Sequence, residues 1–133
     1  MPETVNVYNI LDGDAKLSRN FSLSEFACKD GSPIVFVDGL LVWILQNVRD
    51  HFGKPITITS AYRTVTHNGK PEVGGEVASY HCRGMAADFV VKGVSPGIVQ
   101  EYLEKIAPNT CGIGRGATYT HIDTRAEKSR WTY

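Results

Sequence analysis

The chain has 133 residues, of which 42% are hydrophobic and 21% charged, and its 14 basic residues balance its 14 acidic ones. This length and composition are typical of one folded domain with one hydrophobic core, and they exclude a disordered chain. A formal net charge of zero is not typical of proteins that bind nucleic acids or anionic membranes. We therefore expect a single domain over residues 1–133. It should be a monomer that binds neither nucleic acid nor a membrane.

Targeting and redox signals are equally plain. No apolar stretch approaches the roughly 20 residues that cross a bilayer, so we expect no membrane span. Residues 1–4 do not start a basic stretch followed by an apolar one, so we expect no secretory signal and a cytoplasmic protein until it is released. The cysteines, Cys28, Cys82 and Cys111, are odd in number and irregularly spaced, which predicts free thiols.

The first third of the chain is weakly patterned. Residues 1–20 are mixed and polar, and we expect a loosely packed arm or an edge strand there. Ser22 and Glu25 form a capping-box pattern, which predicts a short helix through about Ala27. The Lys-Asp-Gly-Ser-Pro segment at 29–33 then predicts a turn.

The clearest helix is predicted from Asp38 to Phe52, where apolar residues recur at spacings of three and four. Asp38 can cap its first turn, and Gly53 and Pro55 end it. The β-branched segment 56–60 predicts a strand.

The second half alternates loops, strands and one helix. Residues 62–79 are rich in Gly, Asn, Thr and Pro and predict a long surface loop, a kind of segment that often carries function. Strands are expected at 86–91, 112–114 and 119–123, and Ser95-Pro96 begins a helix that ends near residue 106. These elements predict an α+β fold, with helices packed on a small, mostly antiparallel sheet.

The sharpest chemical feature is the pair His81 and Asp88. On one helix they would stand about 10.5 Å apart along the axis. A zinc ion needs each donor atom at about 2.0–2.2 Å, so a helix could not present both. Gly84 and the strand pattern after it instead predict a loop, a turn and a strand, which can bring both donors to one point.

A second candidate pair, His121 and Asp123, shares one face of the last predicted strand because strand side chains alternate. One can bind a metal while the other acts on bound water or orients the ligand. Two histidines, one carboxylate and an open position form a catalytic zinc site, which activates water and polarises a carbonyl. The residues alone leave open that His81 is an ordinary surface or core histidine and that Asp88 caps a turn.

The pattern Ser-x-His-x-x-Gly-x-Ala-x-Asp at 79–88 resembles the signature of the zinc D-Ala-D-Ala carboxypeptidase family. Its superfamily includes phage endolysin peptidases, D-alanyl-D-alanine dipeptidases and the hedgehog signalling domain. Further similar segments lie at 21–31, 58–63, 74–75, 112–114, 121–125 and 130–131. The compact branch found in phages, prophages and bacterial murein peptidases is the most similar. The resemblance implies the hedgehog/D-Ala-D-Ala peptidase fold with a zinc site on the sheet.

The same resemblance implies roles for individual residues. It implies one Zn²⁺ per chain, bound by His81, Asp88 and His121. It matches Arg63 to an arginine that contacts substrate and the developing oxyanion, a role that suits a fixed guanidinium. Ser79 is expected near the substrate as support for the loop, and His67 is expected to line the substrate groove because it lies in the long loop. A surface ion pair for Arg63 and a solvated loop position for His67 are the alternatives.

One position departs from the family pattern. Many relatives carry Glu or Asp three residues before the last histidine ligand, where this chain has Thr118. We predict Asp123 as the catalytic general base in its place, and the alternative that Asp123 binds the metal while His121 supports it stays open. The resemblance implies hydrolysis of murein stem or cross-bridge peptides at the cell wall, in phage or prophage lysis. The alternative is a non-catalytic zinc-containing module that binds the wall or belongs to a phage structure.

Overall fold

The computed structural model describes residues 5–71 and 79–133. Its strands are β1 (Val5–Asn9), β2 (Lys16–Ser18), β3 (Phe21–Ser22), β4 (Ile34–Asp38), β5 (Ile56–Ser60), β6 (Ala86–Val91), β7 (Gly112–Arg115), β8 (Thr120–Asp123) and β9 (Ser129–Thr132). Its helices are α1 (Gly39–Phe52), α2 (Val65–Asn68) and α3 (Pro96–Ile106), and single 3-10 turns lie at Ile10–Asp12, Leu23–Phe26 and Tyr80–Arg83. The predicted α+β class is confirmed.

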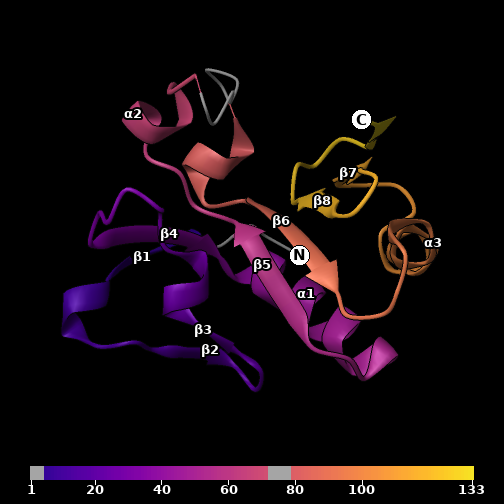
Figure 1. Cartoon of the computed structure of the whole chain (residues 1–133), viewed down its shortest axis with the longest axis horizontal. Coiled ribbons are helices and arrows are strands. Elements are labelled where there is room, and N and C mark those ends of the chain that lie inside the picture. The colour runs from indigo at the N-terminus through magenta and orange to yellow at the C-terminus, as the bar shows by residue number, and fades with distance from the viewer. Residues whose placement is uncertain (1–4, 72–78) are drawn as a thin grey trace.

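The five strands from β5 to β9 form one sheet, in the order β5-β6-β8-β7-β9 (Figure 1). All of its neighbours are antiparallel except β7 and β9, which run parallel. The expected strands at 56–60, 86–91, 112–114 and 119–123 correspond to four of the five. The fifth, β9, was not predicted from the sequence.

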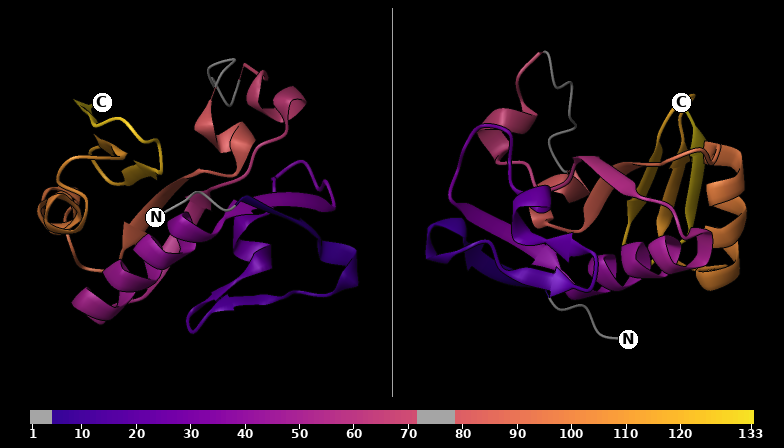
Figure 2. Two further views of the ribbon diagram at one scale, coloured as in Figure 1. Left: turned by 180° about the vertical axis from the view of Figure 1, so that it is seen from behind. Right: turned by 60° about the horizontal axis from the view of Figure 1, so that its bottom comes forward.

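Both long helices pack against one face of this sheet (Figure 2). The face is apolar because alternate residues of each strand point to it. Phe89 of β6, Ile113 of β7 and Ile122 of β8 are fully buried there, in one cluster with Leu45 of α1 and Leu103 of α3. The opposite face of the same strands is therefore left for polar side chains.

The predicted helix boundaries are confirmed by their caps. The Asp38 carboxylate accepts a hydrogen bond from the Leu40 amide at 3.1 Å, and Gly53 ends α1 in the left-handed conformation with φ of 63°. Ser95 caps α3 by accepting from the Ile98 amide, with Pro96 in the first turn. Short polar side chains thus satisfy amide groups that the first helical turn leaves without partners.

The N-terminal region is more regular than the sequence suggests. Strand β1 pairs along its whole length with β4 in antiparallel register, Val5 opposite Asp38 and Asn9 opposite Ile34. A loosely packed arm or an edge strand was expected over residues 1–20, and β1 agrees with the second alternative. The sequence did not predict its partner β4. The capping box at Ser22 and Glu25 is present, and it starts a 3-10 turn that ends at Phe26.

The long loop predicted at 62–79 contains the short helix α2, capped by Thr64. Residues 72–78, which include the Gly74-Gly75 similarity, lie outside the described residues. Within the described ranges no helix is long and apolar enough to cross a membrane. The three cysteines are free thiols, as predicted.

Candidate metal centre

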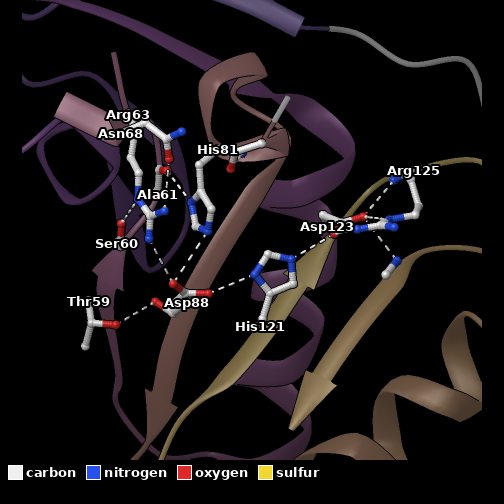
Figure 3. Close-up of polar contacts among 12 residues, drawn as sticks. Thr59, Ser60, Ala61, Arg63, Asn68, His81, Asp88, His121, Asp123 and Arg125 are labelled. Atoms are coloured by element: carbon white, nitrogen blue, oxygen red, sulfur yellow. Dashed lines mark hydrogen bonds and ion pairs between the residues drawn. The ribbon is translucent and has the colours of Figure 1, made fainter. Parts of the chain in front are cut away.

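Three donor side chains from separate segments converge on the polar face of the sheet (Figure 3). They are His81 from the 3-10 turn at 80–83, Asp88 from β6 and His121 from β8. One ligand atom from each lies within 4.8 Å of the other two. Among residues 5–71 and 79–133 this is the set of three or more His, Cys, Asp or Glu residues that converges in this way.

Strand register brings two of the donors together. Asp88 and His121 are directly opposite each other in the antiparallel β6–β8 pair, so their side chains lie side by side on one face. Both side chains are mostly buried, with 15% of Asp88 and 8% of His121 exposed. The predicted strand for Asp88 therefore also places it beside the second histidine.

A tight turn delivers the third donor. Ser79 caps the turn by accepting a hydrogen bond from the His81 amide at 3.1 Å. Gly84 ends it in the left-handed conformation with φ of 73°, and a Cβ there would lie 2.3 Å from the Phe36 carbonyl oxygen. Only glycine fits both demands. The loop, turn and strand expected for this segment correspond to the 3-10 turn, Gly84 and β6.

The His81 ring is fixed by a backbone acceptor. Its Nδ1 lies 2.7 Å from the carbonyl oxygen of Ala61. A carbonyl can only accept, so Nδ1 carries the hydrogen and Nε2 keeps its lone pair. That Nε2 lies 3.5 Å from Oδ2 of Asp88. The ring is thus held in the tautomer that binds a metal through Nε2.

The His121 ring lies between two carboxylates. Its Nε2 is 2.8 Å from Oδ2 of Asp123, and its Nδ1 is 2.9 Å from Oδ1 of Asp88. Burial alone would lower the pKa of His121, because it disfavours the charged ring. The hydrogen bonds to Asp123 and Asp88 outweigh this effect and raise the pKa above its usual value of 6.5. When the ring is protonated, the proton on Nδ1 bridges His121 and Asp88 at 2.9 Å, and a cation bound there would take the place of that proton.

Asp123 lies behind His121, on the side away from Asp88 (Figure 3). Its carboxylate is fully buried, and it accepts hydrogen bonds from the Gly112 amide and from Nε and an Nη of Arg125. Burial alone would raise the pKa of Asp123, but the hydrogen bonds with Arg125 and His121 hold it well below its usual range. A general base must reach the proton that it abstracts. In this structure the Asp123 carboxylate contacts Gly112, Arg125 and His121, and its expected role in proton transfer stays a prediction.

Arg63 points at the same centre from the loop after β5. One Nη lies 3.4 Å from Oδ2 of Asp88, the other 3.3 Å from Oδ1 of Asn68, and Nε donates to the Ser60 hydroxyl at 3.0 Å. The Arg63 side chain is 14% exposed, and its guanidinium contacts all three of these residues. Arg63 is therefore a fixed positive charge beside the metal ligands, and the surface ion pair considered as its alternative does not describe it.

The donor set fits zinc. Four donors at about 2.1 Å in a tetrahedron stand roughly 3.4 Å apart. The His81–Asp88 separation of 3.5 Å matches that spacing, and the His121–Asp88 separation of 2.9 Å needs only a small opening. Burial disfavours the charged form of the Asp88 carboxylate, but its hydrogen bond with His121 and the proximity of both histidines outweigh burial and hold the pKa of Asp88 well below its usual range, so it is ionised and ready to bind.

Comparison with known families agrees with this geometry. The Peptidase M15 family model matches residues 19–123, well over half of the chain. The chain belongs to the Peptidase M15 family. M15 peptidases are zinc enzymes, and the His81, Asp88 and His121 triad is compatible with that metal. No curated protein matches the sequence significantly.

Ser79 and His67, the other two residues expected near the substrate of this M15 chain, lie in different segments. Ser79 supports His81 through the turn, as described above. His67 lies in α2, and among the residues that the structure describes its buried Nδ1 has no hydrogen-bond partner. The expected substrate roles of Ser79 and His67 stay predictions. Thr118, which replaces the carboxylate of many relatives, is exposed in the β7–β8 turn.

The sequence did not predict the layer of aromatic side chains that lies beside the candidate metal ligands. The Trp131 ring centroid lies 5.2 Å from that of His121, and the Arg125 guanidinium lies between Trp131 and Tyr80, at 5.2 Å and 4.5 Å from their rings. Tyr119 lies next to it, and partial burial, with the nearby Tyr133 and Asp88, raises its pKa to about 12. Strand alternation, which places Tyr119 on the face of His121, was the available signal.

Proposed function

We propose that the chain is a zinc-dependent peptidase that hydrolyses murein stem or cross-bridge peptides, with zinc bound by His81, Asp88 and His121. One observation carries the proposal. Both imidazole rings are fixed by a second hydrogen bond, so that Nε2 of His81 and Nδ1 of His121 face an ionised carboxylate. Family membership supports the peptidase class, and the resemblance of the 79–88 segment supports the murein substrate.

Bound zinc would polarise the scissile carbonyl and lower the pKa of a water molecule to about 7. Arg63 would stabilise negative charge that develops on the carbonyl oxygen, or bind a terminal carboxylate of the peptide. A guanidinium already held by Ser60 and Asn68 needs little rearrangement to do so. Its position beside Asp88 supports this role.

For Asp123 we propose positioning rather than proton transfer. Its ionised carboxylate accepts from Nε2 of His121, and this directs the lone pair of Nδ1 towards the metal site. Arg125 keeps Asp123 ionised and oriented through two hydrogen bonds at 2.7 Å and 2.8 Å. Such carboxylate–histidine–metal arrangements raise the basicity of the ligand and fix its orientation.

The proposal is tested by digesting purified murein with zinc-loaded protein and identifying the products by mass spectrometry. We expect one zinc per chain and cleaved peptides. Asp88→Asn should lose the zinc and at least about a thousandfold in rate, because a bound metal contributes several kcal/mol to transition-state stabilisation. Asp50→Asn, an exposed carboxylate on α1, is the matched control and should keep both. Loss of terminal D-alanine would identify a carboxypeptidase, and separation of cross-linked peptides an endopeptidase.

A second candidate is a non-catalytic zinc module that binds the cell wall or belongs to a phage structure. Two observations favour it: Thr118 is exposed and carries no carboxylate, and the Asp123 carboxylate is committed to His121 and Arg125. Murein that stays intact in the presence of protein with stoichiometric zinc, while it binds that protein in a pull-down assay, would support this candidate and contradict hydrolysis. For either function we propose the cell wall as the place of action.

A further inference from the structure

Three glycines at alternate positions, two in β7 and one directly after it, lie on the polar face of the sheet. They are Gly112, Gly114 and Gly116, and each is covered by a side chain from a neighbouring segment. A Cβ on Gly112 would lie 2.4 Å from Oδ2 of Asp123. On Gly114 it would lie 2.4 Å from Nε1 of Trp131, and on Gly116 2.6 Å from Cε1 of Tyr119. Larger residues would therefore displace these side chains.

The glycines let side chains of β8 and β9 meet across β7. Gly114 is directly opposite His121 on one side and Trp131 on the other, and these two rings are 5.2 Å apart. The arrangement repeats one step along the strand. The Gly116 amide donates to the Tyr119 carbonyl, and the Tyr119 and Tyr133 rings lie 5.3 Å apart. Trp131 and Tyr133 are themselves neighbours at 6.3 Å, so the rings form one continuous layer.

Tyr119 is the member of this layer best placed to meet a substrate. It lies two residues before His121, on the same face and about 7 Å along the strand. Its ring is partly exposed. The accessible part of this ring therefore lies on the face of the sheet that carries the candidate metal ligands.

We propose that Tyr119, held against Tyr133 over Gly116, is a substrate-contacting residue that binds the peptide about two residues from the scissile bond. This inference rests on the proposed peptidase function. An extended peptide advances about 3.4 Å per residue, so the 7 Å step from His121 corresponds to about two residues. The hydroxyl would hydrogen-bond a peptide group of the substrate, and the flat ring would pack against a small side chain such as that of alanine. Gly116 is a positioning residue for Tyr119.

The test compares Tyr119→Phe, Tyr119→Ala and Gly116→Ala with wild type, on a defined murein peptide, by KM, kcat and zinc content. Loss of the hydroxyl alone should raise KM about three- to tenfold, because one hydrogen bond to the substrate is lost. Tyr119→Ala should raise KM at least tenfold. Gly116→Ala should act in the same direction, and it should add nothing to Tyr119→Ala in the double variant, because both changes act through one ring. Zinc content should stay at the wild-type level throughout.

Tyr102→Phe is the matched control, since Tyr102 stacks on His51 at the helical side of the molecule. It should leave KM unchanged. The inference is overturned if Tyr119→Ala keeps KM within twofold of wild type, or if the Tyr119 variants lose zinc in proportion to activity.

A wild-type protein that cleaves nothing would instead contradict the peptidase proposal, and calorimetric binding of the uncleaved peptide then decides the role of Tyr119. Weaker binding by Tyr119→Phe would support the inference, whereas equal binding, or none by wild type, would overturn it.

Discussion

The two faces of the five-stranded sheet are built from the same strands and have opposite chemistry. On one face Phe89, Ile113 and Ile122 are fully buried among apolar side chains of α1 and α3. On the other, Asp88 and His121 are nearly as inaccessible but polar, and each has hydrogen-bond partners. Burial is thus compatible with either chemistry, provided that each buried polar atom is satisfied.

This comparison teaches how tightly site and core are coupled. Strand side chains alternate with period two, so a one-residue slip of β8 would exchange His121 for Ile122 at the metal centre. The apolar face prevents that slip because it would expose Ile122 and bury a histidine among the helices. The core therefore sets the register that the metal ligands require. A substitution on one face should therefore have an effect that differs from that of a matched substitution on the other.

The largest effect is expected from Phe89→Ala on the apolar face. Removing a fully buried aromatic ring should lower the free energy of unfolding by about 3–5 kcal/mol, because packing is lost and a cavity is left. Urea denaturation of the metal-free protein measures it. Val90→Ala, the neighbour that points to the other face, is the control and should cost about 1 kcal/mol or less. Equal losses for the two variants would contradict the separation of the faces.

Asp123→Asn should act mainly on the metal face. The neutral amide holds the His121 tautomer less firmly and supplies no charge, so zinc affinity should fall about 10- to 100-fold. Competition with a chromophoric chelator measures the dissociation constant, again with Asp50→Asn as the control. If Asp123 were instead the general base, the substitution would abolish hydrolysis while zinc affinity stayed at the wild-type value.

The smallest effect concerns pH. The pKa of His121 is raised above 6.5 in the metal-free protein, so zinc must displace a proton from it at lower pH. Protonation of His121 should therefore lower zinc affinity by about tenfold per pH unit below that pKa. Asp88 and Asp123, whose pKa values lie well below their usual range, should add no further dependence until strongly acidic pH. Chelator competition between about pH 5 and pH 8 gives the profile.

A matched variant sharpens this last prediction. Asp123→Asn removes one of the two carboxylates that raise the pKa of His121, so the fall in affinity should begin at a lower pH than in wild type. A pH profile that is flat, or identical in the two proteins, would show that His121 does not lose a proton when zinc binds.

Local patterns in the sequence predicted the elements that depend on local signals. The apolar spacing of α1, the Ser95-Pro96 start of α3 and the β-branched run of β5 were sufficient. β4 and β9 were not predicted, because each is a short segment whose strand conformation depends on a distant partner, β1 in one case and β7 in the other. Parallel pairing of β9 in particular has no local signature.

The same division applies to the metal site. Residue type and spacing identified His81, Asp88 and His121 as candidates and showed that a helix could not hold the first two. The sequence could not decide whether His121 or Asp123 is the ligand, since both share one strand face. The tertiary structure favours His121, because Asp88 of β6 lies opposite it while Arg125 and Gly112 hold Asp123 behind it.

By itself, the sequence determined the chain's α+β class, its main helices and its family signature, all of which depend on residues close together in the chain. Only the tertiary structure decided which nitrogen of each histidine faces Asp88, what Asp123 contacts, and why β7 needs its glycines. These features depend on side chains that meet across strands from distant parts of the chain. Their positions follow from strand register and packing, which no local pattern encodes.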